Sequence, residues 1–149
     1  MYINYSCIFM VAFVFICGCG TPPFQPISGT VTLDGKPLPN CKVGFFPDVT
    51  EFKPDTHGFA FGMSNEKGEY EAQHPKGDKG IYAGKYKVFF EAWVDNKGNP
   101  ISPESKPSEV PGGVKNCVPA KYESPETTPI TASVGSGGGK FNFDLSSKN

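Results

Sequence analysis

Proline and glycine interrupt this chain so often that long helices are excluded. The 149 residues include 18 glycines and 15 prolines. After residue 26, the longest stretch without either is Lys85–Lys97. Because proline breaks helix interiors and glycine weakens them, the sequence rules out a helical bundle. The 13 Phe, 6 Tyr and 1 Trp favour a β core instead and argue against wholesale disorder.

The charge balance argues against a nucleic-acid partner. The formal net charge is −1, and all 14 basic residues are lysines. A nucleic-acid-binding domain normally carries a basic surplus and uses arginine for planar, bidentate contacts. We therefore expect no nucleic acid among the partners of this protein.

The N-terminal segment predicts export. No Asp, Glu, Lys or Arg precedes Asp34, and Ile8–Cys17 is an apolar run of ten residues. As a helix this run would span about 15 Å, half of a hydrocarbon core of about 30 Å. That length is typical of the apolar region of a signal peptide.

The end of the apolar run carries the motif Ile16-Cys17-Gly18-Cys19, which resembles the lipobox of bacterial lipoproteins. The resemblance implies that residues 1–18 are removed as a signal peptide and that Cys19 is lipidated. Residues 19–26 would form a proline-rich tether, and Gly20 implies transport to the outer membrane. We expect a cell-envelope protein that multiple acyl chains hold on the outer membrane or a periplasm-facing membrane. The alternatives are an ordinary signal cleavage site, an uncleaved anchor or a hydrophobic N-terminal strand.

Two cysteines, Cys41 and Cys117, remain after this processing. In an oxidising compartment they are a candidate disulfide. Such a bond would close a loop of about 76 residues and stabilise the fold by about 4 kcal/mol in the chain-entropy model. The alternative is a pair of small buried thiols.

Seven short strands separated by turn residues are predicted after the tether. In the clearest of them, Lys85–Val94, every second residue from Tyr86 onward is apolar. The pattern predicts an all-β fold, a seven-stranded antiparallel β-sandwich over residues 27–146, with loops at Asp48–His57 and Asp95–Val118. The strands are Ile27–Leu33, Asn40–Pro47, Phe59–Ser64, Glu69–Gln73, Lys85–Val94, Thr131–Val134 and Lys140–Leu145. Their predicted inward residues are Val31, Leu33, Cys41, Val43, Phe45, Tyr70, Ala72, Tyr86, Val88, Phe90, Ala92, Val94, Phe141, Phe143 and Leu145.

Several motifs follow one another in a fixed order along these strands. They are Ile27–Asn40 (ISGTVTLDGKPLPN), Ser64–Tyr70 (SNEKGEY), Ala83–Val88 (AGKYKV), Val118–Tyr122, Ser124–Ile130 and Phe141–Leu145. The first three resemble carboxypeptidase regulatory-like and transthyretin-like domains, and the others resemble the tail of secreted bacterial lipoproteins with such a domain. The resemblance implies a prealbumin-like, Greek-key sandwich. It implies no single function, since such domains are mostly accessory or adhesive modules.

No pattern of catalytic residues stands out. Hydroxyisourate hydrolases, which share the related fold, need an Arg and a C-terminal Tyr-Arg-Gly-Ser, and intradiol dioxygenases need a His-x-His pair. Here the two histidines, His57 and His74, lie 17 residues apart, and no GxSxG or phosphate-loop sequence occurs. We expect no catalytic residue, no cofactor and no metal.

The expected function is that of a non-enzymatic, membrane-tethered lipoprotein with a structural or protein-interaction role in the cell envelope. The alternative is a carbohydrate- or peptide-binding module. Phe89 and Trp93 motivate it, because they share the otherwise polar face of strand Lys85–Val94 and would form an aromatic platform for a sugar ring. In the competing interpretation, a second sheet, a loop or a partner covers these two side chains.

Overall fold

The computed structural model describes residues 24–102 and 104–148, so the leader, Cys19 and most of the tether lie outside the described residues. In the described part, the regular structure consists of β-strands and two short 3-10 helices, η1 (Pro107–Glu109) and η2 (Ala120–Tyr122). The prediction of an all-β protein with antiparallel sheets is confirmed. The strands are β1 (Phe24–Gln25), β2 (Ile27–Leu33), β3 (Lys36–Pro37), β4 (Lys42–Pro47), β5 (Ala60–Met63), β6 (Glu69–Glu71), β7 (Ile81–Tyr82), β8 (Gly84–Glu91), β9 (Trp93–Val94), β10 (Lys115–Asn116), β11 (Thr131–Val134), β12 (Gly139–Lys140) and β13 (Phe143–Leu145).

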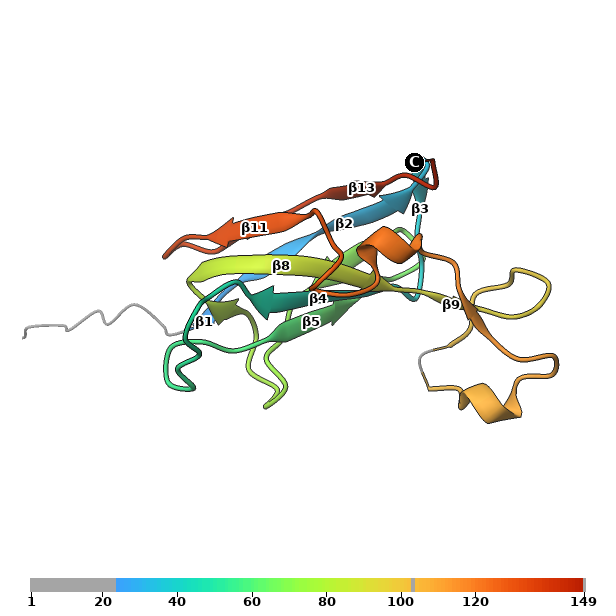
Figure 1. The fold of residues 1–149 in the computed structure, drawn as a ribbon, viewed down its shortest axis with the longest axis horizontal. Coiled ribbons are helices and arrows are strands. Elements are labelled where there is room, and N and C mark those ends of the chain that lie inside the picture. The colour runs from blue at the N-terminus through green and yellow to red at the C-terminus, as the bar shows by residue number, and fades with distance from the viewer. Residues whose placement is uncertain (1–23, 103, 149) are drawn as a thin grey trace, which may run out of the picture.

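One antiparallel sheet has the strand order β11-β8-β4-β5 (Figure 1). Its central pair, β4 and β8, is in register from Lys42 opposite Glu91 to Pro47 opposite Tyr86. Because side chains alternate between the two faces of a strand, Lys42, Gly44 and Phe46 share the face that also carries Phe89. The opposite face of both strands is buried.

A second sheet is built around β2. β6 and β3 pair with one edge of β2 in antiparallel fashion, whereas β12 and β13 pair with the other edge in parallel. The prediction of an entirely antiparallel arrangement is therefore wrong at this edge. The N–H of Gly139 donates to the carbonyl of Pro26 at 3.0 Å, so the C-terminal segment starts beside the beginning of β2 and runs in the same direction.

Two of the predicted strands are interrupted. Strand Lys85–Val94 is divided at Ala92, whose N–H donates to Oδ1 of Asn116 at 2.9 Å. Strand Lys140–Leu145 is divided before Phe143, where Oδ1 of Asn142 accepts from both the N–H and the hydroxyl of Thr30 at 3.1 Å. In both places, the amide oxygen of an asparagine side chain accepts a hydrogen bond that a backbone carbonyl of a neighbouring strand would accept in a continuous sheet.

The core lies between the two sheets. Aromatic rings connect them, since the centroid of Phe45 lies 6.2 Å from that of Tyr70, and the centroid of Phe90 lies 5.3 Å from that of Phe143. Every predicted inward residue is buried or packs against the core while half-buried. The hydroxyl of Tyr70 donates to the carbonyl of Phe141 at 2.8 Å, which satisfies its polar group at the edge of the core.

Candidate functional site

Large apolar side chains gather on the outer face of the sheet β11-β8-β4-β5. We call this surface the aromatic face and define it by Phe46, Phe59, Phe61, Met63, Phe89 and Trp93. The strand register produces it, because Gly44 of β4 lies between Phe61 of β5 and Phe89 of β8. Phe46 is 48% exposed, Phe59 is 53% exposed and Trp93 is 45% exposed.

Phe89 rests against the backbone of the neighbouring strand. A Cβ added at Gly44 would lie 2.3 Å from two ring atoms of Phe89, so only glycine leaves room for the ring in this position. Phe89 is half-buried as a result. Together with Phe46, Phe59 and Phe61 it lines a pocket of about 320 Å³.

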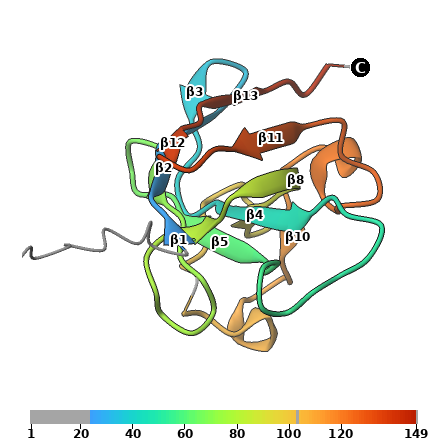
Figure 2. The ribbon, with the colours of Figure 1, turned by 90° about the vertical axis from the view of Figure 1, so that its left-hand side faces the viewer.

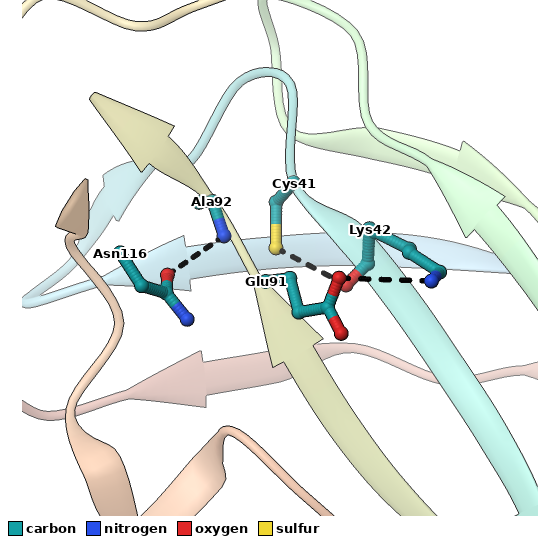
Figure 3. Close-up of polar contacts among 5 residues, drawn as sticks. All are labelled: Cys41, Lys42, Glu91, Ala92 and Asn116. Atoms are coloured by element: carbon teal, nitrogen blue, oxygen red, sulfur yellow. Dashed lines mark hydrogen bonds and ion pairs between the residues drawn. The ribbon is translucent and has the colours of Figure 1, made fainter. Parts of the chain in front are cut away.

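An ion pair divides the aromatic face. Nζ of Lys42 lies 3.6 Å from a carboxylate oxygen of Glu91, which stands between Phe89 and Trp93 along the chain (Figure 3). The same Nζ lies 5.8 Å from the ring centroid of Phe61, within cation–π range. Both charged side chains are about one-third exposed, so the pair adds little stability. The ion pair instead separates the part of the aromatic face around Phe89 from the part around Trp93.

Trp93 lines a different pocket, of about 310 Å³, which the long loop 95–118 covers on one side. The loop is tied to the sheet, because β10 pairs with β9 and the N–H of Ile101 donates to the carbonyl of Trp93 at 2.9 Å. The pocket has apolar and polar walls, formed by Asn40, Lys42, Met63, Glu91, Trp93, Ile101, Ser102, Ser105, Pro107 and Val114. Phe89 and Trp93 therefore lie on one face but line separate pockets.

Cys41 and Cys117 are both free thiols in the structure. Burial raises the pKa of Cys41 to about 12, and the neighbouring Cys117 thiol adds to this rise. Burial also raises the pKa of Cys117. Because the thiolate is the nucleophilic form of cysteine, burial lowers the reactivity of both thiols in the reduced protein. The disulfide between them stays a prediction.

The two histidines lie in loop surroundings. Nδ1 of His57 accepts from the N–H of Lys53 at 2.9 Å, and the His74 ring lies 5.1 Å from that of Phe24. Among residues 24–102 and 104–148, no group of three or more His, Cys, Asp or Glu is placed to hold a metal ion. No helix in that part of the chain has the length and hydrophobicity of a membrane-spanning segment.

Comparisons with known proteins give no family. No protein-family model and no curated protein matches the chain. Among solved structures, it is similar to a 9R-lipoxygenase from Cyanothece PCC8801, with a TM-score of 0.35 and 12% identity. That similarity covers 83% of this chain and 16% of the lipoxygenase, and at this TM-score it carries no argument about fold or activity.

Most of the aromatic face was missing from the sequence prediction, which named Phe89 and Trp93 alone. Phe46, Phe59, Phe61 and Met63 belong to it as well. A signal was available, because a half-buried strand normally alternates apolar and polar residues. In strand Phe59–Ser64, the alternate positions that are expected to be polar are instead occupied by large apolar residues.

Proposed function

We propose that this protein is a non-enzymatic lipoprotein of the cell envelope, anchored through Cys19, whose aromatic face binds a protein partner. The aromatic face carries this proposal. Five of its six side chains are at least 36% exposed: Phe46, Phe59, Phe61, Met63 and Trp93. Single exposed apolar residues are normal, but contiguous ones mark interaction surfaces.

The chemistry of the aromatic face favours a protein as the partner. Interface cores between proteins are enriched in aromatic residues and Met and depleted of charge. Lys42 and Glu91 are the charged side chains that line the two pockets beside Phe89 and Trp93, and they form an ion pair with each other. The two pockets, of about 310 and 320 Å³, offer space for anchoring side chains of a partner.

The proposal also includes a specific fold family for the domain. We assign the domain to the transthyretin-like, seven-stranded Greek-key sandwiches. The core contacts of Phe45 with Tyr70 and of Phe90 with Phe143 support it, because they join residues of two sheets. The order of the motifs between Ile27 and Leu145 supports it as well.

A carbohydrate or a peptide is the second candidate ligand, and the pocket beside Trp93 favours it. The half-exposed indole offers a flat surface for a sugar ring. The amide of Asn40 and the hydroxyls of Ser102 and Ser105 line the same pocket and would hydrogen-bond sugar hydroxyls. In this alternative Trp93 is essential and Phe59 is not.

A pair of double variants tests the binding function. Phe59→Ser with Phe61→Ser removes two exposed rings from the aromatic face, whereas Lys36→Ser with Asp144→Ser changes exposed positions of β3 and β13 in the other sheet. Native electrophoresis of mildly solubilised envelopes should show a large complex for the wild type and the Lys36/Asp144 control only. A complex that survives the loss of both rings contradicts the proposal. A ligand on a glycan array that is lost with Trp93→Ala alone favours the second candidate.

The anchor has its own test. Cys19→Ser should abolish metabolic labelling with a fatty-acid analogue, and the protein should stall unprocessed or move to the soluble fraction. Equal labelling of the wild type and the variant would show that Cys19 is not the acylated residue.

A further inference from the structure

The first described strand fixes where the tether joins the domain. β1 pairs with β7, with Phe24 opposite Tyr82, and the two rings lie 4.7 Å apart. Gln25 is buried. The chain therefore enters the fold beside β7, at the end of the molecule opposite to β9 (Figure 1). We call this the tether end.

The tether is too short to let this end move far from a membrane. Five residue steps separate Cys19 from Phe24. A fully extended chain of that length spans at most about 18 Å. The conclusion that the tether end stays close to a membrane rests on the proposed function, because it requires that acyl chains on Cys19 hold that residue at the bilayer surface.

The loop 48–57 lies at the tether end and carries two exposed apolar side chains. The N–H of Asp48 donates to the carbonyl of Lys85 at 2.9 Å, at the start of β8. Figure 2 views the molecule from this end and shows the loop after β4 at its rim. Val49 is 39% exposed and Phe52 is 54% exposed.

Local hydrogen bonds give this loop a defined shape. The N–H of His57 donates to the carbonyl of Lys53 at 2.7 Å, and Nδ1 of His57 accepts from the N–H of Lys53 at 2.9 Å. The ring of Phe52 lies beside that of His57, with centroids 6.0 Å apart. Phe52 is thus presented on an ordered turn, so little further ordering is needed for it to contact another surface.

We propose that loop 48–57 is a second membrane contact, in which Val49 and Phe52 enter the interface of the bilayer that holds the lipid anchor. Charge does not drive this contact. Loop 48–57 carries Lys53 against Asp48, Glu51 and Asp55, so its formal net charge is −2 and charge does not attract it to an anionic lipid surface. The contact is therefore apolar and insensitive to salt. It would hold the domain with its tether end at the membrane and Trp93 far from it, where a partner can reach it.

The native tryptophan makes a direct test possible. The mature, lipidated protein is reconstituted in phosphatidylcholine–phosphatidylethanolamine vesicles that contain brominated acyl chains, which quench nearby indoles. Phe52→Trp combined with Trp93→Phe reports on the loop, and the wild type reports on Trp93. Strong quenching at position 52 and none at position 93, unchanged in high salt, is the expected result.

Separate outcomes identify which step fails. No quenching at position 52, with mass spectrometry showing acylated Cys19 and the protein on vesicles, overturns the second contact but leaves the anchor intact. Quenching that disappears in high salt overturns the apolar mode of contact. Unmodified Cys19 overturns the proposed anchor, and the inference about the loop falls with it.

Discussion

Truncation of Phe90 should remove a large part of the stability of the domain. The Phe90 side chain is fully buried, with its ring centroid 5.3 Å from that of Phe143 and 6.4 Å from that of Tyr122. Phe90→Ala deletes the ring and leaves an enclosed cavity, which costs about 3–5 kcal/mol. A domain of this size has about 5–15 kcal/mol in total. In urea, with a slope of about 1–3 kcal/mol per molar, the midpoint should fall by about 2 M.

The adjacent residue provides the control. Phe89 lies on the opposite face of the same strand, half-buried over Gly44. Phe89→Ala should cost about 1 kcal/mol, because the ring is already partly in water and its loss leaves no enclosed cavity. Urea denaturation of the two variants, followed by circular dichroism, measures both values. Equal losses, or a loss below about 1.5 kcal/mol for Phe90→Ala, would refute the assignment of the inward and outward faces.

Three further predictions concern backbone packing, alkaline pH and the cysteines. Gly29→Ala should destabilise the protein by about 1–3 kcal/mol and by more than Gly44→Ala does in the same urea assay. A Cβ at Gly29 would lie 1.7 Å from the backbone carbonyl oxygen of Phe141, whereas a Cβ at Gly44 meets a ring that can move. In the reduced protein, burial raises the pKa values of both Cys41 and Tyr86 to about 12 from their ordinary values of 9.0 and 10.0. The folded state therefore keeps protons that the unfolded state releases, so the free energy of unfolding should fall from about pH 9 to about pH 12. Denaturant titrations should give a shallower fall for Cys41→Ala, and an identical fall would contradict the role of this thiol. Finally, maleimide labelling of the unfolded, exported protein should find Cys41 and Cys117 protected until a reductant is added, and free thiols without reductant would reject the disulfide.

Local patterns were enough to predict some elements of the fold. Strand Ile27–Leu33 coincides with β2 to the residue, because its alternation and the turn that follows it are contained in a short segment. The interruption at Ala92 was not predictable in this way. It depends on the side chain of Asn116, 24 residues further along the chain. The parallel pairing of β13 with β2 likewise depends on where the turn after β11 brings the chain.

The candidate site was predicted only in part for a similar reason. Alternation within one strand placed Phe89 and Trp93 on the same face, and the structure agrees. The register of β4 then brings Lys42 opposite Glu91, and the resulting ion pair separates the two aromatic residues. Pairing between strands that are distant in sequence also adds Phe61 to the face, which alternation within a single strand cannot show.

Photo-crosslinking in living cells tests the binding role of the aromatic face most directly. A benzoylphenylalanine at position 61 lies on the aromatic face, and one at Asp144 occupies an exposed position of the other sheet as the control. Irradiation should give a discrete adduct with a single envelope protein from position 61 and none from position 144. No adduct at position 61, or the same adducts from both positions, would contradict the binding role of this face.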